Sequence, residues 1–155
     1  TQIKPIKEQL YDPTTDETYE EKKKYGKSVK GIGDKTATAI LLATNGLTGF
    51  ENEDKLSKFL GVTPHSHDSG TSIRRKGKMT KYGSSEVRQL LYMCTRSAIR
   101  YNQPCKELYQ RLRRNGKPHK LAAVAVMHKL IKQFFACVTK KTLFDNDYHL
   151  KNKKK

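Results

Sequence analysis

The sequence predicts an all-α fold in which a helix-hairpin-helix precedes a long basic loop and a bundle of three longer helices. Apolar residues recur at helical spacing through most of the 155-residue chain. No segment sustains the alternation of apolar and polar residues that a half-buried strand shows. The longest apolar stripes lie in the C-terminal half, after a stretch that is rich in Ser, Thr, His and basic residues. A chain of this length is enough for one domain with tails.

Residues 1–28 are expected to form a polar leader or linker before this domain. They contain six basic and six acidic side chains, so their charges cancel. The run Glu20-Glu21-Lys22-Lys23-Lys24 is compatible with a helix or with a leader that docks elsewhere. The chain begins with Thr1 rather than Met, and we therefore expect a fragment of a longer protein.

A glycine-rich turn is predicted at Gly31-Ile32-Gly33, directly before a helix over residues 34–44. Glycines permit a tight turn without a Cβ atom in the way, so that a phosphate can approach main-chain N–H groups. The start of the following helix offers further unpaired N–H groups and the positive end of its dipole. This pattern is typical of a helix-hairpin-helix, which holds the DNA backbone without reading its sequence, although an ordinary glycine-rich helix start is the alternative. The candidate DNA-binding residues here are Gly31, Gly33, Lys35 and Thr36.

A second short helix is predicted at residues 53–60, and Gly61 provides its stop. Its apolar side consists of Leu56, Phe59 and Leu60. Residues 62–83 then form the longest irregular stretch, and loops of that length in compact domains tend to be functional or disordered. Five cations and no acid occur between positions 74 and 81. The candidate DNA-binding residues of this region are Arg74, Arg75, Lys76, Lys78 and Lys81, followed by Arg88 on the next helix.

Three longer helices are predicted over residues 85–101, 104–115 and 119–138, each from an apolar stripe at helical spacing. The stripes consist of Val87, Leu90, Leu91, Cys94 and Ala98 in the first helix, Cys105, Leu108, Tyr109 and Leu112 in the second, and Val124, Met127, His128, Ile131, Phe134, Phe135 and Val138 in the third. Because His128 lies on the third stripe, we expect a core or partly buried histidine rather than a metal ligand. Residues 146–155 form a basic tail that is expected to be disordered.

The composition indicates a cytoplasmic protein with a polyanionic partner, although a basic domain without a particular ligand is the alternative. The formal net charge is +17, and residues 74–141 hold eighteen basic side chains against two acids. Such a field attracts nucleic acid, whose phosphates lysine and arginine contact. The three cysteines have neither the pattern of a disulfide framework nor that of a zinc site, so reduced thiols are expected. The sequence shows no signal peptide and no apolar run that we expect to span a bilayer.

Ser69 is the candidate nucleophile of the long loop. It precedes Gly70 and lies close in sequence to cations that would stabilise a pentacoordinate phosphate. A serine hydroxyl is a weak nucleophile that needs an activating base or a metal, and His65, His67 and Asp68 are the local candidates for a base or an orienting group. From these residues alone, a common Ser-Gly turn is the favoured interpretation.

In their order along the chain, these motifs resemble the C-terminal transposase domain of the serine-containing, DEDD-type insertion-sequence transposases. That family includes the Piv-like DNA invertases and the bridge-RNA-guided recombinases. The resemblance covers roughly residues 29–145. Its motifs are Gly31-Ile32-Gly33 with Thr36-Ala37, Phe59-Leu60-Gly61-Val62-Thr63-Pro64, Ser69-Gly70, Gly77-Lys78-Met79-Thr80-Lys81-Tyr82-Gly83, Val87-Arg88-Gln89-Leu90-Leu91-Tyr92, Asn115-Gly116-Lys117-Pro118 and Leu143-Phe144-Asp145.

The resemblance implies a DNA transposase or site-specific recombinase in which Ser69 attacks a phosphodiester and forms a transient phosphoserine link. Ser66 and Ser72 flank this serine, and Ser69 is preferred because it directly precedes the glycine of the motif. The resemblance also implies a RuvC-like domain whose acidic residues bind divalent metal, expected to be Mg²⁺. That domain would precede Thr1, so this fragment is expected to hold no metal and to be inactive alone. The implied partners are bacterial DNA, further copies of the same protein and, for some members, a guide RNA from the same element.

Two non-catalytic interpretations compete with this one. In the first, the chain is a helix-hairpin-helix DNA-binding module and Ser69 is only a turn residue. In the second, it is a basic RNA-binding structural protein, such as a ribosome-associated domain. An acidic RuvC-like segment upstream in the gene would favour the transposase, whereas binding to structured RNA without a preference for DNA would favour the last interpretation.

Overall fold

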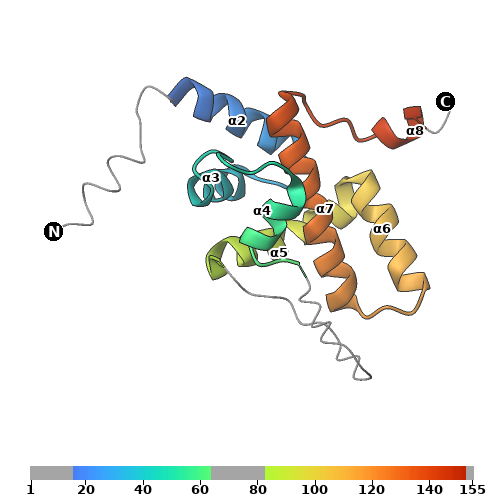
Figure 1. The fold of residues 1–155 in the computed structure, drawn as a ribbon. Helices are drawn as coiled ribbons and strands as arrows, with labels where there is room; N and C mark the ends of the chain where they lie inside the picture. Colours follow the sequence, from blue (N-terminus) through green and yellow to red (C-terminus); the bar gives the residue numbers. More distant parts are fainter. Residues whose placement is uncertain (1–15, 64–82, 153–155) are drawn as a thin grey trace.

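The computed structural model describes residues 16–63 and 83–152, and within these ranges it contains helices and no strands (Figure 1). The all-α prediction is therefore confirmed. The helices are α2 (Asp16–Ser28), α3 (Asp34–Ala43), α4 (Glu53–Phe59), α5 (Ser85–Tyr101), α6 (Gln103–Arg114), α7 (His119–Lys140) and α8 (Tyr148–Asn152). The five helices predicted from apolar spacing correspond to α3 to α7, and their ends differ from the predicted ends by two residues or fewer.

Helix α7 is the centre of the described domain, because α2, α4, α5 and α6 all pack against it (Figure 1). Its buried side chains are Ala122, Ala123, Val126, Met127, Leu130, Ile131, Phe134, Cys137 and Val138. With 22 residues, α7 is long and apolar enough to cross a bilayer by length and composition alone. The sequence did not single it out as a span, since Lys129 and Lys132 interrupt its apolar run. Its position among four other helices is that of a core helix.

Helix α2 resolves what the sequence left open about the N-terminal segment. Residues 16–28 are helical and pack against α3 and α7, so this half of the expected leader is part of the folded domain. Contact with α7 is close because Gly26 lies directly over the ring of Phe134, where a Cβ atom would overlap it. Tyr19 and Tyr25 add partly buried apolar surface. Residues 1–15 lie outside the described ranges.

The C-terminal segment differs from the disordered tail expected over residues 146–155. Residues 148–152 form the short helix α8, and only 153–155 lie outside the described ranges. Asp145 organises the start of this segment, since its carboxylate accepts a hydrogen bond from the N–H of Asp147 at 3.0 Å and contacts Lys151 Nζ at 2.6 Å. Asp145, which precedes α8, is thereby bonded to Lys151 within that helix.

Most of the side chains expected in the core are buried, but several are only partly buried, including Leu108, Tyr109 and Leu112 on α6, and one is exposed. Phe59 was assigned to the apolar side of the second helix, but it is 47% exposed and packs edge-on against Phe50, with ring centroids 5.2 Å apart. The three cysteines are free and buried, and burial raises the pKa of the Cys105 thiol to about 12. His128 is partly buried as expected, and burial lowers the pKa of its imidazole.

Candidate nucleic-acid interface

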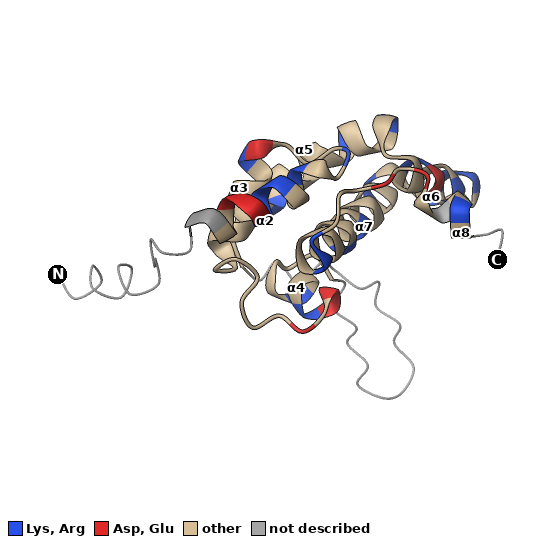
Figure 2. Cartoon of the chain, turned by 90° about the horizontal axis from the view of Figure 1, so that it is seen from above, with Lys and Arg blue, Asp and Glu red and all other residues tan. Residues whose placement is uncertain are grey.

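Basic side chains dominate the C-terminal half of the described domain. Residues 83–141 carry thirteen lysines and arginines, against two acids. Figure 2 shows these cations on α5, α6 and α7, while several of the acids lie on α2, at the start of α4 and beside α6. Helix α7 carries four lysines and no acid of its own, and one of them, Lys132, pairs with Glu53 of α4 at 3.7 Å. This arrangement favours a polyanionic partner.

The turn between α2 and α3 is built around Gly31. This residue has φ +106°, a conformation that L side chains rarely adopt, and a Cβ atom there would lie 2.9 Å from the Cβ of Ala98 on α5. Ile32 is buried, and its N–H donates to the carbonyl of Val29 at 3.0 Å. The turn is therefore packed against the core through Ile32. Position 31 requires glycine because α5 approaches it closely.

Gly33 occupies the opposite side of the same turn and faces outward. It is exposed, a Cβ atom added to it would meet nothing within 4 Å, and it caps α3 without a side-chain hydrogen bond. The first N–H groups of a helix have no intrahelical partner, so the start of α3 presents a positive dipole end to solvent. Lys35 is exposed at this helix start, as expected for a phosphate contact.

The side chain of Thr36 does not fit the expected DNA contact. It is only 5% exposed, and its Oγ1 lies 3.2 Å from Cys94 Sγ in the core between α3 and α5. The third position of a helix beginning at Asp34 points to the side that packs on α5, which the Gly-x-Gly pattern alone does not reveal. Only the main chain of Thr36 remains available for a phosphate at the helix start.

An ion cluster that the sequence did not predict lies beside this turn. The Asp34 carboxylate is 3.1 Å from Lys27 Nζ and 3.2 Å from Lys23 Nζ, both on α2. Hydrogen bonds from Lys27 and Lys23 lower the pKa of Asp34. The signal that could have found it is the spacing of Lys23 and Lys27, which are four residues apart and share one helix face. The Asp34 carboxylate neutralises two lysines that would otherwise be available to an anion at the start of α3.

Asn102 hydrogen-bonds directly to the turn and holds it in place. It is fully buried between α5 and α6, and its Nδ2 donates to the carbonyl of Lys30 at 3.0 Å and to Gln133 Oε1 at 2.7 Å. Its Oδ1 accepts from the N–H of Cys105 at 3.3 Å, which caps α6. One buried amide thus connects the α2–α3 turn to α6 and α7. Such a satisfied buried network fixes the backbone of the turn.

The long basic loop leaves and re-enters the domain at one place. Helix α4 ends with Gly61 at φ +72°, where the N–H groups of Gly61 and Val62 bond back to Lys58 and Ser57, each at 3.0 Å. The returning chain passes so close to α4 that a Cβ atom at Gly83 would overlap the carbonyl oxygen of Phe59. The two stems of the loop are therefore adjacent at the C-terminal end of α4.

Six of the expected site residues lie outside the described ranges. These are Ser69, Arg74, Arg75, Lys76, Lys78 and Lys81. Arg88, which follows the loop, is half-buried, and its Nη1 donates to the carbonyl of Gly83 at 3.2 Å. This arginine therefore helps to hold the returning stem of the loop. In residues 16–63 and 83–152, no group of three or more His, Cys, Asp or Glu side chains is arranged to hold a metal ion.

The described residues define a basic, all-helical domain with an outward-facing helix start beside a glycine turn. The chain belongs to the Transposase IS116/IS110/IS902 family, whose family model matches residues 25–110. That match runs from the end of α2, through the turn and the loop, into α6.

The chain is also similar to individual proteins from Moraxella and Streptomyces. The pilin gene-inverting protein of Moraxella bovis is 28% identical over 123 residues, which make up 79% of this chain and 38% of that protein. The pilin gene-inverting protein of Moraxella lacunata is 27% identical, with the same coverage. An uncharacterized 43.6 kDa protein of the insertion element IS110 from Streptomyces coelicolor is 24% identical over 119 residues, 77% of this chain and 29% of that protein. The chain thus spans less than two fifths of the length of these relatives.

Proposed function

We propose that this chain is the DNA-handling part of a transposase or site-specific recombinase, with Ser69 as the nucleophile that attacks DNA. The observation that carries the proposal is the family match over residues 25–110, which includes both the α2–α3 turn and the serine loop. Two relatives are by name proteins that invert a pilin gene, which is a rearrangement of DNA. The anchored loop stems and the basic surface are what a protein needs to present a nucleophile to a bound phosphodiester.

In the proposed step, the Ser69 oxygen forms a bond to phosphorus while the bond from phosphorus to one sugar oxygen breaks. The serine proton passes to a base, and the sugar oxygen leaves as a hydroxyl after taking up a proton. The five cations between positions 74 and 81 would offset the negative charge that builds on the attacked phosphate. Because the phosphoserine link conserves the energy of the phosphodiester, a second strand end can displace the serine without an external energy source.

The chain would depend on parts of a longer protein for turnover. We propose that a RuvC-like domain preceding Thr1 holds the divalent metal, expected to be Mg²⁺, and that the present chain alone is inactive. Within its described residues, no acidic cluster fits that metal. We further propose that several copies act together in the bacterial cytoplasm on DNA, with a guide RNA from the same element as an additional component.

For the α2–α3 unit we propose a helix-hairpin-helix that binds the DNA backbone through Gly31, Gly33 and the start of α3. Support comes from two packed helices joined by a short glycine turn, and from the exposed Lys35 beside it. A non-catalytic module with this same unit is the second candidate. It would bind DNA equally well but would form no covalent link.

DNA binding should depend on salt through the cations of the loop. Replacing Arg74, Arg75 and Lys76 together with Ala should reduce the log–log salt slope by roughly 0.9 for every phosphate that these side chains neutralise in the parent chain. Fluorescence anisotropy with duplex DNA over a series of salt concentrations measures this slope. A matched control replaces three lysines on α2 and α4, which are Lys24, Lys55 and Lys58. An affinity that does not respond to salt would contradict phosphate binding, and a preference for structured RNA would favour an RNA-binding protein instead.

Removing the Asp34 carboxylate should strengthen DNA binding. Asp34→Asn frees Lys27 to face a phosphate at the start of α3 and leaves Lys23 with Glu20 alone, at 3.9 Å. We expect an affinity about two- to fivefold higher, the range of one exposed ion pair. Asp145→Asn is the matched control, because it also removes a carboxylate that pairs with a lysine, but on the far C-terminal segment. Equal gains from the two variants would show that only net charge matters.

The same ion pair sets a pH dependence. Since the folded protein lowers the pKa of Asp34, its stabilising effect is present above the ordinary carboxyl pKa and is lost as the pH falls through the lowered value. Asp34→Asn should therefore reduce the loss of folding stability on the acid side, which denaturant unfolding of both chains over a pH series measures. If the free energy of unfolding falls equally with decreasing pH in both chains, this carboxylate has no stabilising role.

A further inference from the structure

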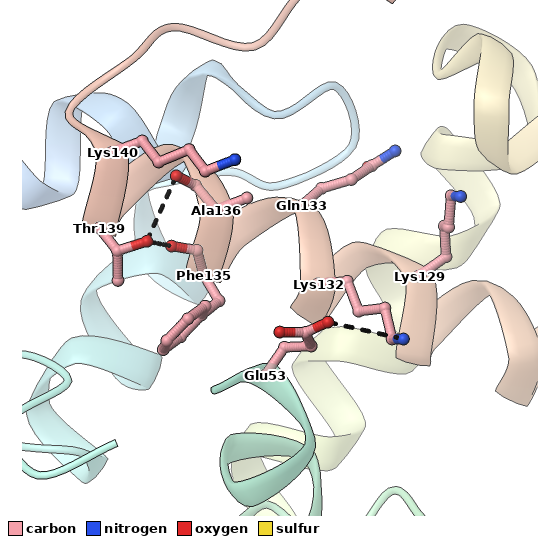
Figure 3. A pocket seen from close by; sticks show the side chains of 8 residues that line it. All are labelled: Glu53, Lys129, Lys132, Gln133, Phe135, Ala136, Thr139 and Lys140. Carbon is pink, nitrogen blue, oxygen red and sulfur yellow. Dashed lines mark hydrogen bonds and ion pairs between the residues drawn. The ribbon is translucent and has the colours of Figure 1, made fainter. Parts of the chain in front are cut away.

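A pocket of about 350 Å³ lies along α7, beside the start of α4 (Figure 3). Its lining comes from α7 and from the first residue of α4. The lining residues are Glu53, Lys129, Lys132, Gln133, Phe135, Ala136, Thr139 and Lys140.

Three lysines that line the pocket lie on one face of α7. Lys129, Lys132 and Lys140 follow one another at spacings of three and eight residues, which places them on one side of the helix, with the small Ala136 between them. In Figure 3 the side chains of Lys129 and Gln133 extend toward the paler helices beside α7, while Lys132 points toward α4. The small alanine leaves a hollow between longer side chains.

The charge in this pocket is only partly balanced. Glu53 is the single carboxylate in the lining, and its Oε1 is 3.7 Å from Lys132 Nζ. Within the described part of the chain, Lys129 and Lys140 have no carboxylate partner. Lys140 lies in the last turn of α7, where a cation is favoured by the helix dipole, but Lys129 and Lys132 lie in the middle of the helix, where the dipole gives no such reason. Uncompensated lysines around a hollow are suited to an anion.

The pocket is connected to the α2–α3 turn by hydrogen bonds through Asn102. Gln133 lines the pocket, and its Oε1 accepts the hydrogen bond from Asn102 Nδ2, which also donates to the carbonyl of Lys30 in the turn. Two hydrogen bonds through one buried side chain therefore hold the pocket wall and the turn in a fixed relation. A polymer with regularly spaced phosphates could then be oriented by both places, whereas a single contact would leave it free to rotate.

From this geometry we propose that the α7 pocket binds phosphates of the DNA backbone, as a second contact in addition to the α2–α3 turn. This inference rests on the proposed DNA-handling function. Lys129 and Lys140 lie eleven residues apart on α7, about 16 Å along the helix, so each supplies charge to a different phosphate of one strand. Glu53 weakens the site by holding Lys132. The contact is to the sugar–phosphate backbone and carries no sequence preference.

The first test removes charge from the pocket without breaking its ion pair. Lys129→Gln with Lys140→Gln is compared with Lys24→Gln and Lys58→Gln, which removes two exposed lysines from α2 and α4. Binding of a short duplex DNA of arbitrary sequence is followed by anisotropy over a range of salt concentrations. We expect the pocket variant to reduce the salt slope by roughly 1 to 2, and the control to leave it nearly unchanged. Equal slopes for the two variants would overturn the proposal.

The second test increases the positive charge available in the pocket instead of reducing it. Glu53→Gln releases Lys132 into the pocket, while Glu51→Gln releases Lys55 on the same stretch of chain but away from the pocket. Both variants raise the net charge by one. We expect Glu53→Gln to bind duplex DNA about two- to fivefold more tightly and Glu51→Gln to resemble the parent chain. Circular dichroism shows whether the double lysine variant is folded. If it is not, the comparison of Glu53→Gln with Glu51→Gln still tests the pocket proposal.

The outcomes separate this inference from the proposed function. If the parent chain binds no duplex DNA at all, the proposed DNA-handling function fails and the pocket proposal fails with it. If the parent chain binds DNA but the Glu53 and Glu51 variants behave alike, only the pocket proposal is overturned. A response of the pocket variants to a structured RNA and not to duplex DNA would likewise overturn it.

Discussion

Replacing Ser69 with Ala in the full-length protein is expected to abolish the covalent protein–DNA adduct while DNA binding stays nearly unchanged. The hydroxyl oxygen is the atom that forms the bond to phosphorus, so cleavage should fall by at least about a thousandfold. Binding should survive because one neutral hydroxyl adds little beside many phosphate contacts. The adduct is measured by trapping labelled DNA on denatured protein, and binding is measured by anisotropy on the same preparations.

The neighbouring serines provide the controls for this experiment. Ser66→Ala and Ser72→Ala should keep the adduct, because neither residue directly precedes the glycine of the motif. Mapping of the labelled peptide identifies the modified residue independently. If Ser69→Ala still forms the adduct, or if the label is found on Ser66 or Ser72, the assignment of Ser69 is wrong. If no variant and no parent protein forms an adduct, the non-catalytic DNA-binding module is the better description.

Gly31→Ala is expected to destabilise the fold by about 2–4 kcal/mol, whereas Gly33→Ala should change the free energy of unfolding by less than about 1 kcal/mol. At position 31, the added Cβ would meet Ala98 at 2.9 Å in a backbone conformation with φ +106°, and both α5 and the turn would have to shift. At position 33, nothing lies within 4 Å of an added Cβ, and φ is −89°. Denaturant unfolding of the two variants measures the difference.

The same pair of glycines separates stability from binding. Gly33→Val keeps the fold but places a branched side chain over the start of α3, so it should weaken binding to unrelated DNA sequences by similar factors. A strongly sequence-dependent effect would mean that this turn reads bases and is not a backbone contact. Equal destabilisation by Gly31→Ala and Gly33→Ala would contradict the close packing of the turn on α5.

The helices of this protein could be predicted from the sequence because their signals are local. Apolar residues at intervals of three and four defined α5 and α7, and Gly61 and Gly116 marked where α4 and α6 stop. These patterns depend only on the helical period and on backbone freedom at glycine, and both act within a few residues. The excess positive charge and the glycine turn could also be predicted, because both can be read directly from the residues along the chain.

The tertiary structure alone decided which of these segments meet and through which side chains. It placed α2 inside the domain through Gly26 and Phe134, which are more than a hundred residues apart, and it buried Thr36 against Cys94. It also connected Lys30 to α7 through Asn102, a contact between residues that are distant in sequence. Each of these contacts depends on how separate helices meet. Because that meeting is set by the packing of the whole core, a local pattern of polar and apolar residues does not determine it.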